Sequence, residues 1–133
     1  MQLYMLDTDT SSYIIRQRPE SVRKRFGQLQ PEQVCISIIT YAELLYGVER
    51  SSSSKINRAI VDNFARHLVI RHWDEAAAEH YAPIRTHLET NGIPIGGMDM
   101  QIAAHARSLG AVLVTNNTRH FERVEGLVLE NWV

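Results

Sequence analysis

The 133-residue chain has a single cysteine, Cys35, and only two lysines. It has no apolar run that approaches the roughly 20 residues needed to span a bilayer. One cysteine excludes an internal disulfide and a zinc site built from several thiolates. The first residues carry Asp7 and Asp9 where a secretory signal would need a basic stretch. We therefore expect a soluble protein of the cytoplasm, where thiols stay reduced.

The chain also lacks an excess of charge of either sign, since its formal net charge is −1. Bulk electrostatics therefore do not indicate a nucleic-acid partner. Twelve of the 14 basic residues are Arg, which can pair with phosphate through two donors at once. A basic cluster comprises Arg16, Arg18, Arg23, Lys24 and Arg25. It either follows a phosphate backbone or is a solvated helix face, and the sequence leaves both readings open.

The length and the 44% hydrophobic content fit one domain over residues 1–133. Apolar patterns and breakers predict strands at 3–6, 34–38, 69–70, 112–114 and 127–129, alternating with helices at 11–18, 19–29, 39–48, 55–68, 74–90 and from 99 to Gly110. We expect helix 39–48 to be buried on all sides and helix 55–68 to be an amphipathic core helix. Pro83 predicts a kink or a break in its helix. The order of elements indicates an α/β fold with a mostly parallel sheet.

The first strand ends in a carboxylate, Asp7, that packing does not explain. Ligands of open α/β sheets bind beyond the carboxyl ends of the strands, where right-handed crossovers also bring the polar end of strand 112–114. We therefore expect Asp7, Glu43, Asp99 and Asn117 to meet at one edge.

Each of these residues also has a structural interpretation. Glu43 has capping-box spacing from Thr40, and Asp99 would suit the dipole of a helix start. Asn117 could be a turn residue in the left-handed conformation. Asp9 is better explained as a cap of the first helix than as a catalytic residue, and Thr10 and Ser11 are the other candidate caps.

Convergence changes this balance, because three neighbouring carboxylates repel one another unless protons or a cation neutralise them. Oxygen ligands select a hard cation, Mg²⁺ or Mn²⁺. Such an ion can polarise a phosphate oxygen and activate water, which is phosphodiester chemistry.

Four segments carry a resemblance that spans nearly the whole chain: YMLDTDTSSYII, SIITYAELLYGVE, GIPIGGMDMQIAAHA and LVTNNTRHFERVEGL. They resemble, in order, the motif regions of PIN-domain ribonucleases, and closely those of the VapC toxins of bacterial type II toxin–antitoxin modules. The resemblance implies a PIN domain, a three-layer α/β/α fold with about five strands. It assigns Asp7, Glu43 and Asp99 to an acidic metal site. Many PIN domains have a fourth acidic residue where this chain has Asn117, which can still offer an amide oxygen but brings no charge. We then expect Thr115 and Asn116 to support the site.

The same resemblance implies an endoribonuclease that depends on Mg²⁺, with Mn²⁺ as a substitute, and that cuts RNA, with tRNA as the expected substrate. It further implies a cognate VapB-type antitoxin and a homodimer.

Two alternatives remain at this stage. Asp7-Thr8-Asp9-Thr10 also fits the start of haloacid dehalogenase-like phosphatases, in which the first Asp is a nucleophile, although Lys24 and Lys55 are the only lysines. A catalytically inactive PIN module that only binds RNA or a partner is the second. Six histidines show no convincing ligand spacing, and we expect His80 and His87 to lie on the surface.

Overall fold

Five short parallel strands form the centre of the structure, a computed structural model that describes residues 1–133. Their order across the sheet is β3-β2-β1-β4-β5. The predicted mostly parallel sheet is therefore parallel throughout. The strands are β1 (Tyr4–Leu6), β2 (Val34–Ser37), β3 (Val69–Arg71), β4 (Val112–Val114) and β5 (Val128–Glu130).

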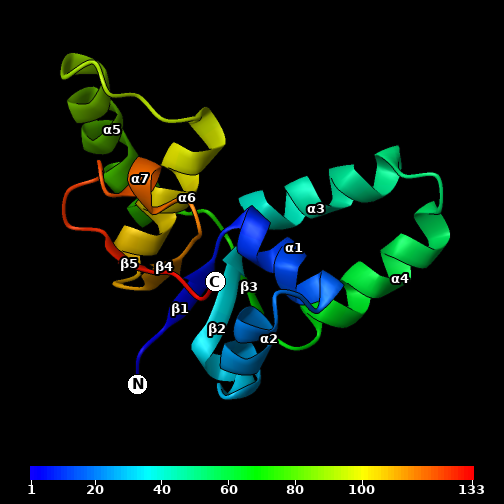
Figure 1. Ribbon diagram of the computed structural model, residues 1–133. Helices are drawn as coiled ribbons and strands as arrows, with labels where there is room; N and C mark the ends of the chain where they lie inside the picture. Colours follow the sequence, from blue (N-terminus) through cyan, green and yellow to red (C-terminus); the bar gives the residue numbers. More distant parts are fainter.

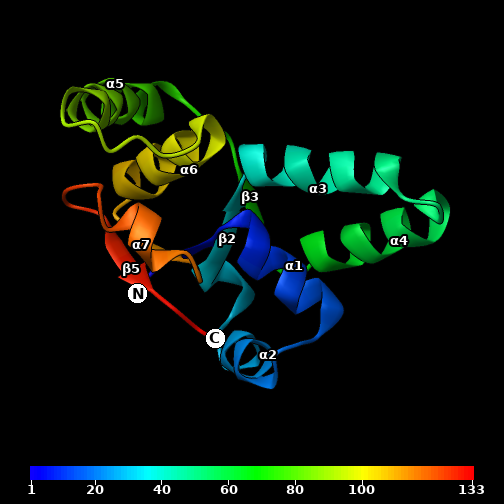
Figure 2. The same ribbon diagram turned by 45° about the horizontal axis from the view of Figure 1, so that its top comes forward.

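Helices cover both faces of this sheet (Figures 1 and 2). One face carries α1 (Thr8–Arg16), α2 (Glu20–Gly27), α3 (Ile38–Arg50) and α4 (Ser54–Ala65), and the other carries α5 (Glu75–Thr90), α6 (Gly97–Ser108) and α7 (Thr118–Phe121). A 3-10 turn, η1 (Pro31–Gln33), precedes β2. The expected three-layer α/β/α architecture is confirmed.

Two separate hydrophobic cores result from this layering. Leu6, Ile36 and Val114 belong to the core under α1 to α4, whereas Met5 and Leu113 belong to the core under α5 to α7. Successive side chains of a strand point to opposite faces, so a run without polar alternation is what a doubly covered strand requires.

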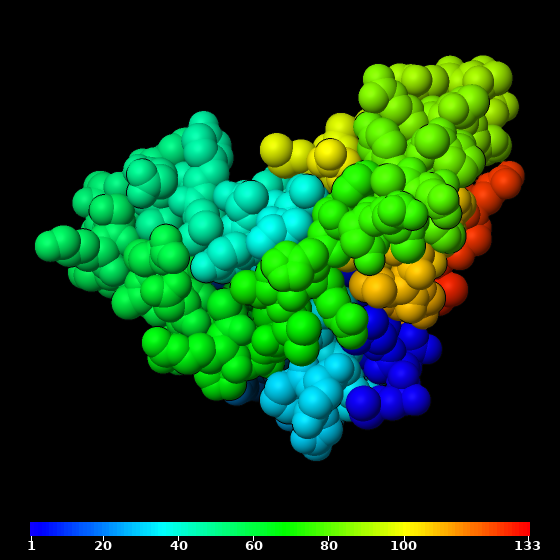
Figure 3. Space-filling view, turned by 180° about the vertical axis from the view of Figure 1, so that it is seen from behind, coloured from blue at the N-terminus to red at the C-terminus, as the bar shows by residue number.

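Helices α3 and α4 form an arm that extends away from the sheet, and α5 projects at the opposite side of the molecule (Figures 1 and 3). The prediction that helix 39–48 is buried on all sides is wrong: Tyr46 is 62% exposed, and only one face, with Thr40, Leu44 and Val48, is buried. The apolar stripe of α4 is likewise split. Phe64 is in the core, but Ile56 and Ile60 remain exposed. The apolar periodicity predicted where these helices lie, but it did not predict which of their apolar residues pack in the core and which stay exposed.

Helix α5 continues through Pro83 without a break. Asp74 caps it as expected, accepting a hydrogen bond from the Ala77 N–H at 3.1 Å. No helix of the structure is both long enough and apolar enough to cross a membrane.

Candidate active site

A cavity of about 110 Å³ lies beyond the carboxyl ends of the central strands β1 and β4. The strand order changes direction here, because β2 lies on one side of β1 and β4 on the other. Such a switch point is the usual ligand site of an open α/β sheet. Seven residues line the cavity: Asp7, Thr8, Asp9, Glu43, Asp99, Asn117 and Phe121. The structure therefore brings all four predicted site residues together.

Asp7 connects the strand to the first helix. Its N–H donates to the Val114 carbonyl at 3.1 Å, and its Oδ1 accepts from the Thr10 N–H at 2.8 Å. Asp7, rather than Asp9, Thr10 or Ser11, is thus the N-cap of α1. Asp9 instead lies in the first turn of that helix and lines the cavity. Burial raises the pKa of the Asp7 carboxyl above its ordinary value of 3.8.

Glu43 is held by α1 rather than by its own helix. Thr8 Oγ1 donates to Glu43 Oε1 at 2.6 Å. The predicted capping box with Thr40 is wrong, because Ser37 caps α3 by accepting from the Ile39 N–H. The carboxylate of Glu43 is therefore free of helix capping and faces the cavity.

Asp99 lies in the first turn of α6, with no side-chain hydrogen bond capping that helix. Its pKa is raised, first by burial and then by the charges of Asp7 and Glu43. The charge of His120 acts in the opposite direction. Carboxylates from three separate parts of the chain therefore repel one another here, a repulsion that protons or a cation would relieve.

Asn117 precedes α7 and makes no capping bond with its side chain. Its φ of −95° is not left-handed, so the left-handed turn interpretation is wrong. Its N–H donates to Thr115 Oγ1 at 2.9 Å, and Thr115 in turn hydrogen-bonds the Asp7 side chain. Asn116 does not support the cavity, because its Oδ1 accepts from Asn131.

The donor set suits a hard divalent cation. The acidic side chains that line the cavity, and Asn117 beside them, offer oxygen ligands. No three His, Cys, Asp or Glu side chains are arranged as a ready-made set of ligands for one ion. Mg²⁺ is commonly held by one or two carboxylates while waters and substrate phosphate oxygens complete its shell. A cavity lined by carboxylates and by the Asn117 amide fits that requirement.

Comparisons with known proteins agree with this geometry. The sequence matches the PIN domain family over residues 4–127. It is 45% identical over 132 residues to the tRNA(fMet)-specific endonuclease VapC of Shigella flexneri and 44% identical over 133 residues to ribonuclease VapC2 of Haemophilus influenzae, with at least 99% of each chain covered. The chain belongs to the VapC group of PIN-domain proteins. A crystal structure of DNA-bound VapBC from Salmonella typhimurium superposes with a TM-score of 0.94 at 43% identity and full coverage of both chains.

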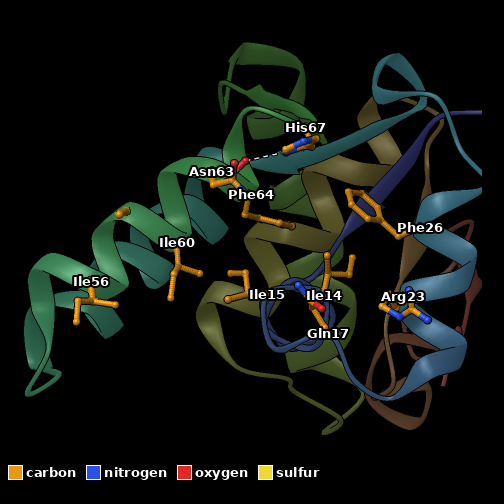
Figure 4. A pocket seen from close by; sticks show the side chains of 11 residues that line it. Ile14, Ile15, Gln17, Arg23, Phe26, Ile56, Ile60, Asn63, Phe64 and His67 are labelled. Carbon is orange, nitrogen blue, oxygen red and sulfur yellow. Dashed lines mark hydrogen bonds between the residues drawn. The ribbon is translucent and has the colours of Figure 1, made fainter.

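This VapC-type chain also has an apolar groove between α1, α2 and α4 (Figure 4). Its volume is about 800 Å³, and its apolar lining includes Ile14, Ile15, Phe26, Ile56, Ile60 and Phe64. An adjoining hollow of about 610 Å³ shares Ile15 and Ile60 with the groove and shares Thr8 and Glu43 with the acidic cavity. The hollow therefore has lining residues in common with both the apolar groove and the acidic cavity.

The basic cluster is not a uniform phosphate track. Arg25 lies over the rings of Tyr4 and Trp132, and its Tyr4 contact includes a 3.1 Å hydrogen bond. Arg23 pairs with Glu20. The cluster therefore divides between structural contacts and solvated positions.

Sequence reasoning missed three contributors to this region. Thr8 and Asp9 depend on how α1 turns after Asp7, which no spacing rule reveals. His120 was set aside with the other histidines, yet its charge acts on Asp99 and its buried Nδ1 has no hydrogen-bond partner. The prediction that His80 lies on the surface is wrong, since it is half-buried and accepts from Arg107 Nε at 2.9 Å.

Proposed function

We propose that this chain is the toxin of a type II toxin–antitoxin module and acts as an endoribonuclease dependent on Mg²⁺ or Mn²⁺, with tRNA as substrate. The observation that carries the proposal is the meeting of Asp7, Glu43 and Asp99 in one cavity at the sheet's switch point. The names of its relatives support RNA as the substrate, and two of those relatives, from Shigella flexneri and Salmonella typhimurium, are named tRNA(fMet)-specific endonucleases.

In this proposal Asp7, Glu43 and Asp99 hold the cation, which would polarise a phosphate oxygen and activate water when bound. Thr8 fixes the Glu43 carboxylate through the 2.6 Å hydrogen bond, and Thr115 does the same for Asp7. Asn117 offers an amide oxygen to the cation or to a water without adding charge. Phe121 closes the buried side of the cavity.

The phosphatase alternative is disfavoured by the same cavity. Neither Lys24 nor Lys55 lines it, so the lysine that such a mechanism requires is missing from the site. The family match over residues 4–127 is also to the PIN domain and not to a phosphatase. An inactive binding module remains a distinct hypothesis, which a cleavage assay can eliminate.

Cleavage of purified RNA by the purified chain tests the proposal. Initiator tRNA, an elongator tRNA and total RNA are each incubated with the protein in EDTA and then with added Mg²⁺ or Mn²⁺. We expect cleavage only with the cation. Cleavage that persists in excess EDTA would contradict the metal site, and no cleavage under any condition would favour the inactive module.

We further propose that an amphipathic segment of the cognate antitoxin occupies the apolar groove. Ile56 and Ile60 are 66% and 43% exposed there, an unfavourable arrangement unless a partner covers them. The hollow that borders both Ile60 and Glu43 would let the same segment place a basic side chain beside the carboxylates. Solved structures similar to this chain include VapBC complexes from Salmonella typhimurium and Rickettsia felis.

Ile60→Asp should weaken binding of the purified antitoxin, because it places a charge in the groove. Ile93→Asp is the matched control, since Ile93 is also exposed but lies in the loop before α6. Calorimetry that shows equal antitoxin affinity for both variants would place the docking surface elsewhere. A homodimer is also proposed, on family resemblance alone, and a strict monomer in light scattering at micromolar concentration would contradict it.

A further inference from the structure

A buried hydrogen bond joins the two layers of helices close to the acidic cavity. His105 of α6 is 1% exposed, and its Nδ1 lies 2.8 Å from Oγ of the fully buried Ser37. The two residues are 68 positions apart in the chain. Breaking such a pair would leave a polar group in the protein interior without a partner, which is unfavourable.

Ser37 lies at the junction between β2 and α3. It ends β2 and is the N-cap of α3, where its Oγ accepts the Ile39 N–H at 3.1 Å. Its hydroxyl hydrogen then remains available to donate to Nδ1 of a neutral His105 ring. The ring also hydrogen-bonds the backbone of His72, in the segment between β3 and α5. His105 thus ties together α6, the start of α3 and the end of β3.

The same two helices carry two of the three carboxylates. Glu43 follows Ser37 by six residues on α3, and Asp99 precedes His105 by six residues on α6. Six helical residues span about 9 Å, so the bond lies within two turns of each carboxylate. The charges of Asp99 and Glu43 repel each other across the cavity. A fixed contact between their helices opposes that repulsion.

We propose that His105 is a positioning residue for the acidic site: through Ser37 it sets the distance between the helix that carries Asp99 and the helix that carries Glu43. The inference rests on the proposed function, because the distance matters only if the carboxylates share a cation. It predicts that loss of the His105–Ser37 bond weakens cation binding more than its effect on stability alone would explain.

The test compares four single variants, His105→Leu, His105→Gln, Ser37→Ala and Arg107→Leu, and the His105→Leu/Ser37→Ala double variant with the wild type. His105→Leu removes the hydrogen bonds and keeps a similar volume, and His105→Gln restores an acceptor and a donor on a side chain of comparable length. Arg107→Leu is the matched control, because Arg107 lies on the same helix but bonds away from the cavity, to His80 and to the Glu125 carbonyl. Mn²⁺ affinity is measured by calorimetry, thermal unfolding in EDTA, and kcat and KM on tRNA.

We expect His105→Leu to weaken Mn²⁺ binding about tenfold, the loss typical of residues that orient metal ligands. His105→Gln should recover most of that affinity. Arg107→Leu should lower the unfolding temperature and leave Mn²⁺ affinity at the wild-type value. Ser37→Ala, a smaller change, should reproduce the effect of His105→Leu, and the double variant should bind no more weakly than the weaker single one.

Equal Mn²⁺ affinity in wild type, His105→Leu and Ser37→Ala would overturn this inference alone. The same holds if Arg107→Leu loses as much affinity as His105→Leu, since general destabilisation would then account for both. If the wild type itself bound no Mn²⁺ and cut no RNA, the proposed function and this inference would fall together. The outcomes are therefore distinguishable.

Discussion

Asp7 performs two tasks with one carboxylate. It caps α1 through the Thr10 N–H and lies in the acidic cavity, where burial raises its pKa. An Asn at this position can still cap the helix but brings no charge. The demands of folding and of cation binding are thus separable at this residue by one substitution.

Asp7→Asn and Asp99→Asn should each lower RNA cleavage by more than about 100-fold, because each removes a charged ligand. Both should also raise the unfolding temperature in EDTA at neutral pH, since a like charge has left a crowded site. Asp62→Asn is the control: Asp62 pairs with Arg58 on the exposed side of α4. A variant of Asp7 or Asp99 that cuts RNA at the control's rate would remove that residue from the site.

Cys35 should be chemically silent in the folded protein. It is fully buried in β2, and burial raises the pKa of its thiol from 9.0 to about 12. The reactive thiolate is therefore about a thousandfold rarer than for a free thiol. A thiol-disulfide exchange reagent at pH 8 should modify one cysteine per chain in guanidinium and none in buffer; rapid modification in buffer would show that β2 opens.

Some site residues were predictable from sequence and others were not, for a physical reason. Asp7 and Asn117 follow apolar strands, and parallel strands bring their carboxyl ends together whatever the details of packing. Thr8, His105 and His120 depend on rotamers and on the angle at which a helix leaves its strand. A capping spacing also misled at Thr40 and Glu43, because Ser37 was available one turn earlier.

At the scale of single elements, amphipathic patterns located the helices but misjudged their surroundings. The arm of α3 and α4 leaves apolar residues exposed, including Tyr46 and Ile56. The sequence pattern is the same whether the sheet or a partner covers that face. Only the structure distinguishes the two cases.

Helix α5 contains a testable local defect. Pro83 is exposed, lies inside the helix and cannot donate to the carbonyl four residues earlier, that of Glu79. Pro83→Ala restores that donor, so the free energy of unfolding should rise by up to about 2 kcal/mol after the greater entropy of the unfolded chain is allowed for. Urea unfolding measures the change.

Ala78→Gly is the companion variant, because Ala78 is also exposed on α5 and its replacement should cost about 1 kcal/mol. If Pro83→Ala were instead destabilising while Ala78→Gly behaved as expected, Pro83 would be contributing packing that outweighs the missing hydrogen bond.

For the whole molecule, the chain order and the rule of right-handed crossovers were enough to predict an α/β fold with one functional edge. The strand order β3-β2-β1-β4-β5 was not predictable from hydrophobicity, because β1, β2 and β4 are equally apolar and differ only in which neighbours they pair with. That order places β1 at the centre and the cavity at its end. Cation binding there should therefore stabilise the entire fold.

The sign of the pH dependence follows from the raised pKa values of Asp7 and Asp99. In the cation-free protein these two carboxyls bind protons more tightly when folded than when unfolded. Their contribution to the free energy of unfolding is fully present below pH 3.8, the ordinary pKa of an Asp side chain. It is lost as the pH rises through their raised pKa values. A divalent cation competes with those protons, so its stabilising effect should grow over the same pH range.

Thermal unfolding in Mn²⁺ and in EDTA should accordingly differ at pH 7.5 and coincide near pH 4. At a Mn²⁺ concentration about 100 times the dissociation constant, linkage gives about 2.7 kcal/mol of stabilisation. For a domain of this size that corresponds to roughly 10 °C in the unfolding temperature. Asp99→Asn should lose most of the difference, and the Asp62→Asn control should retain it. A shift of equal size at pH 4, or in Asp99→Asn, would mean that Mn²⁺ stabilises the protein somewhere other than the acidic cavity.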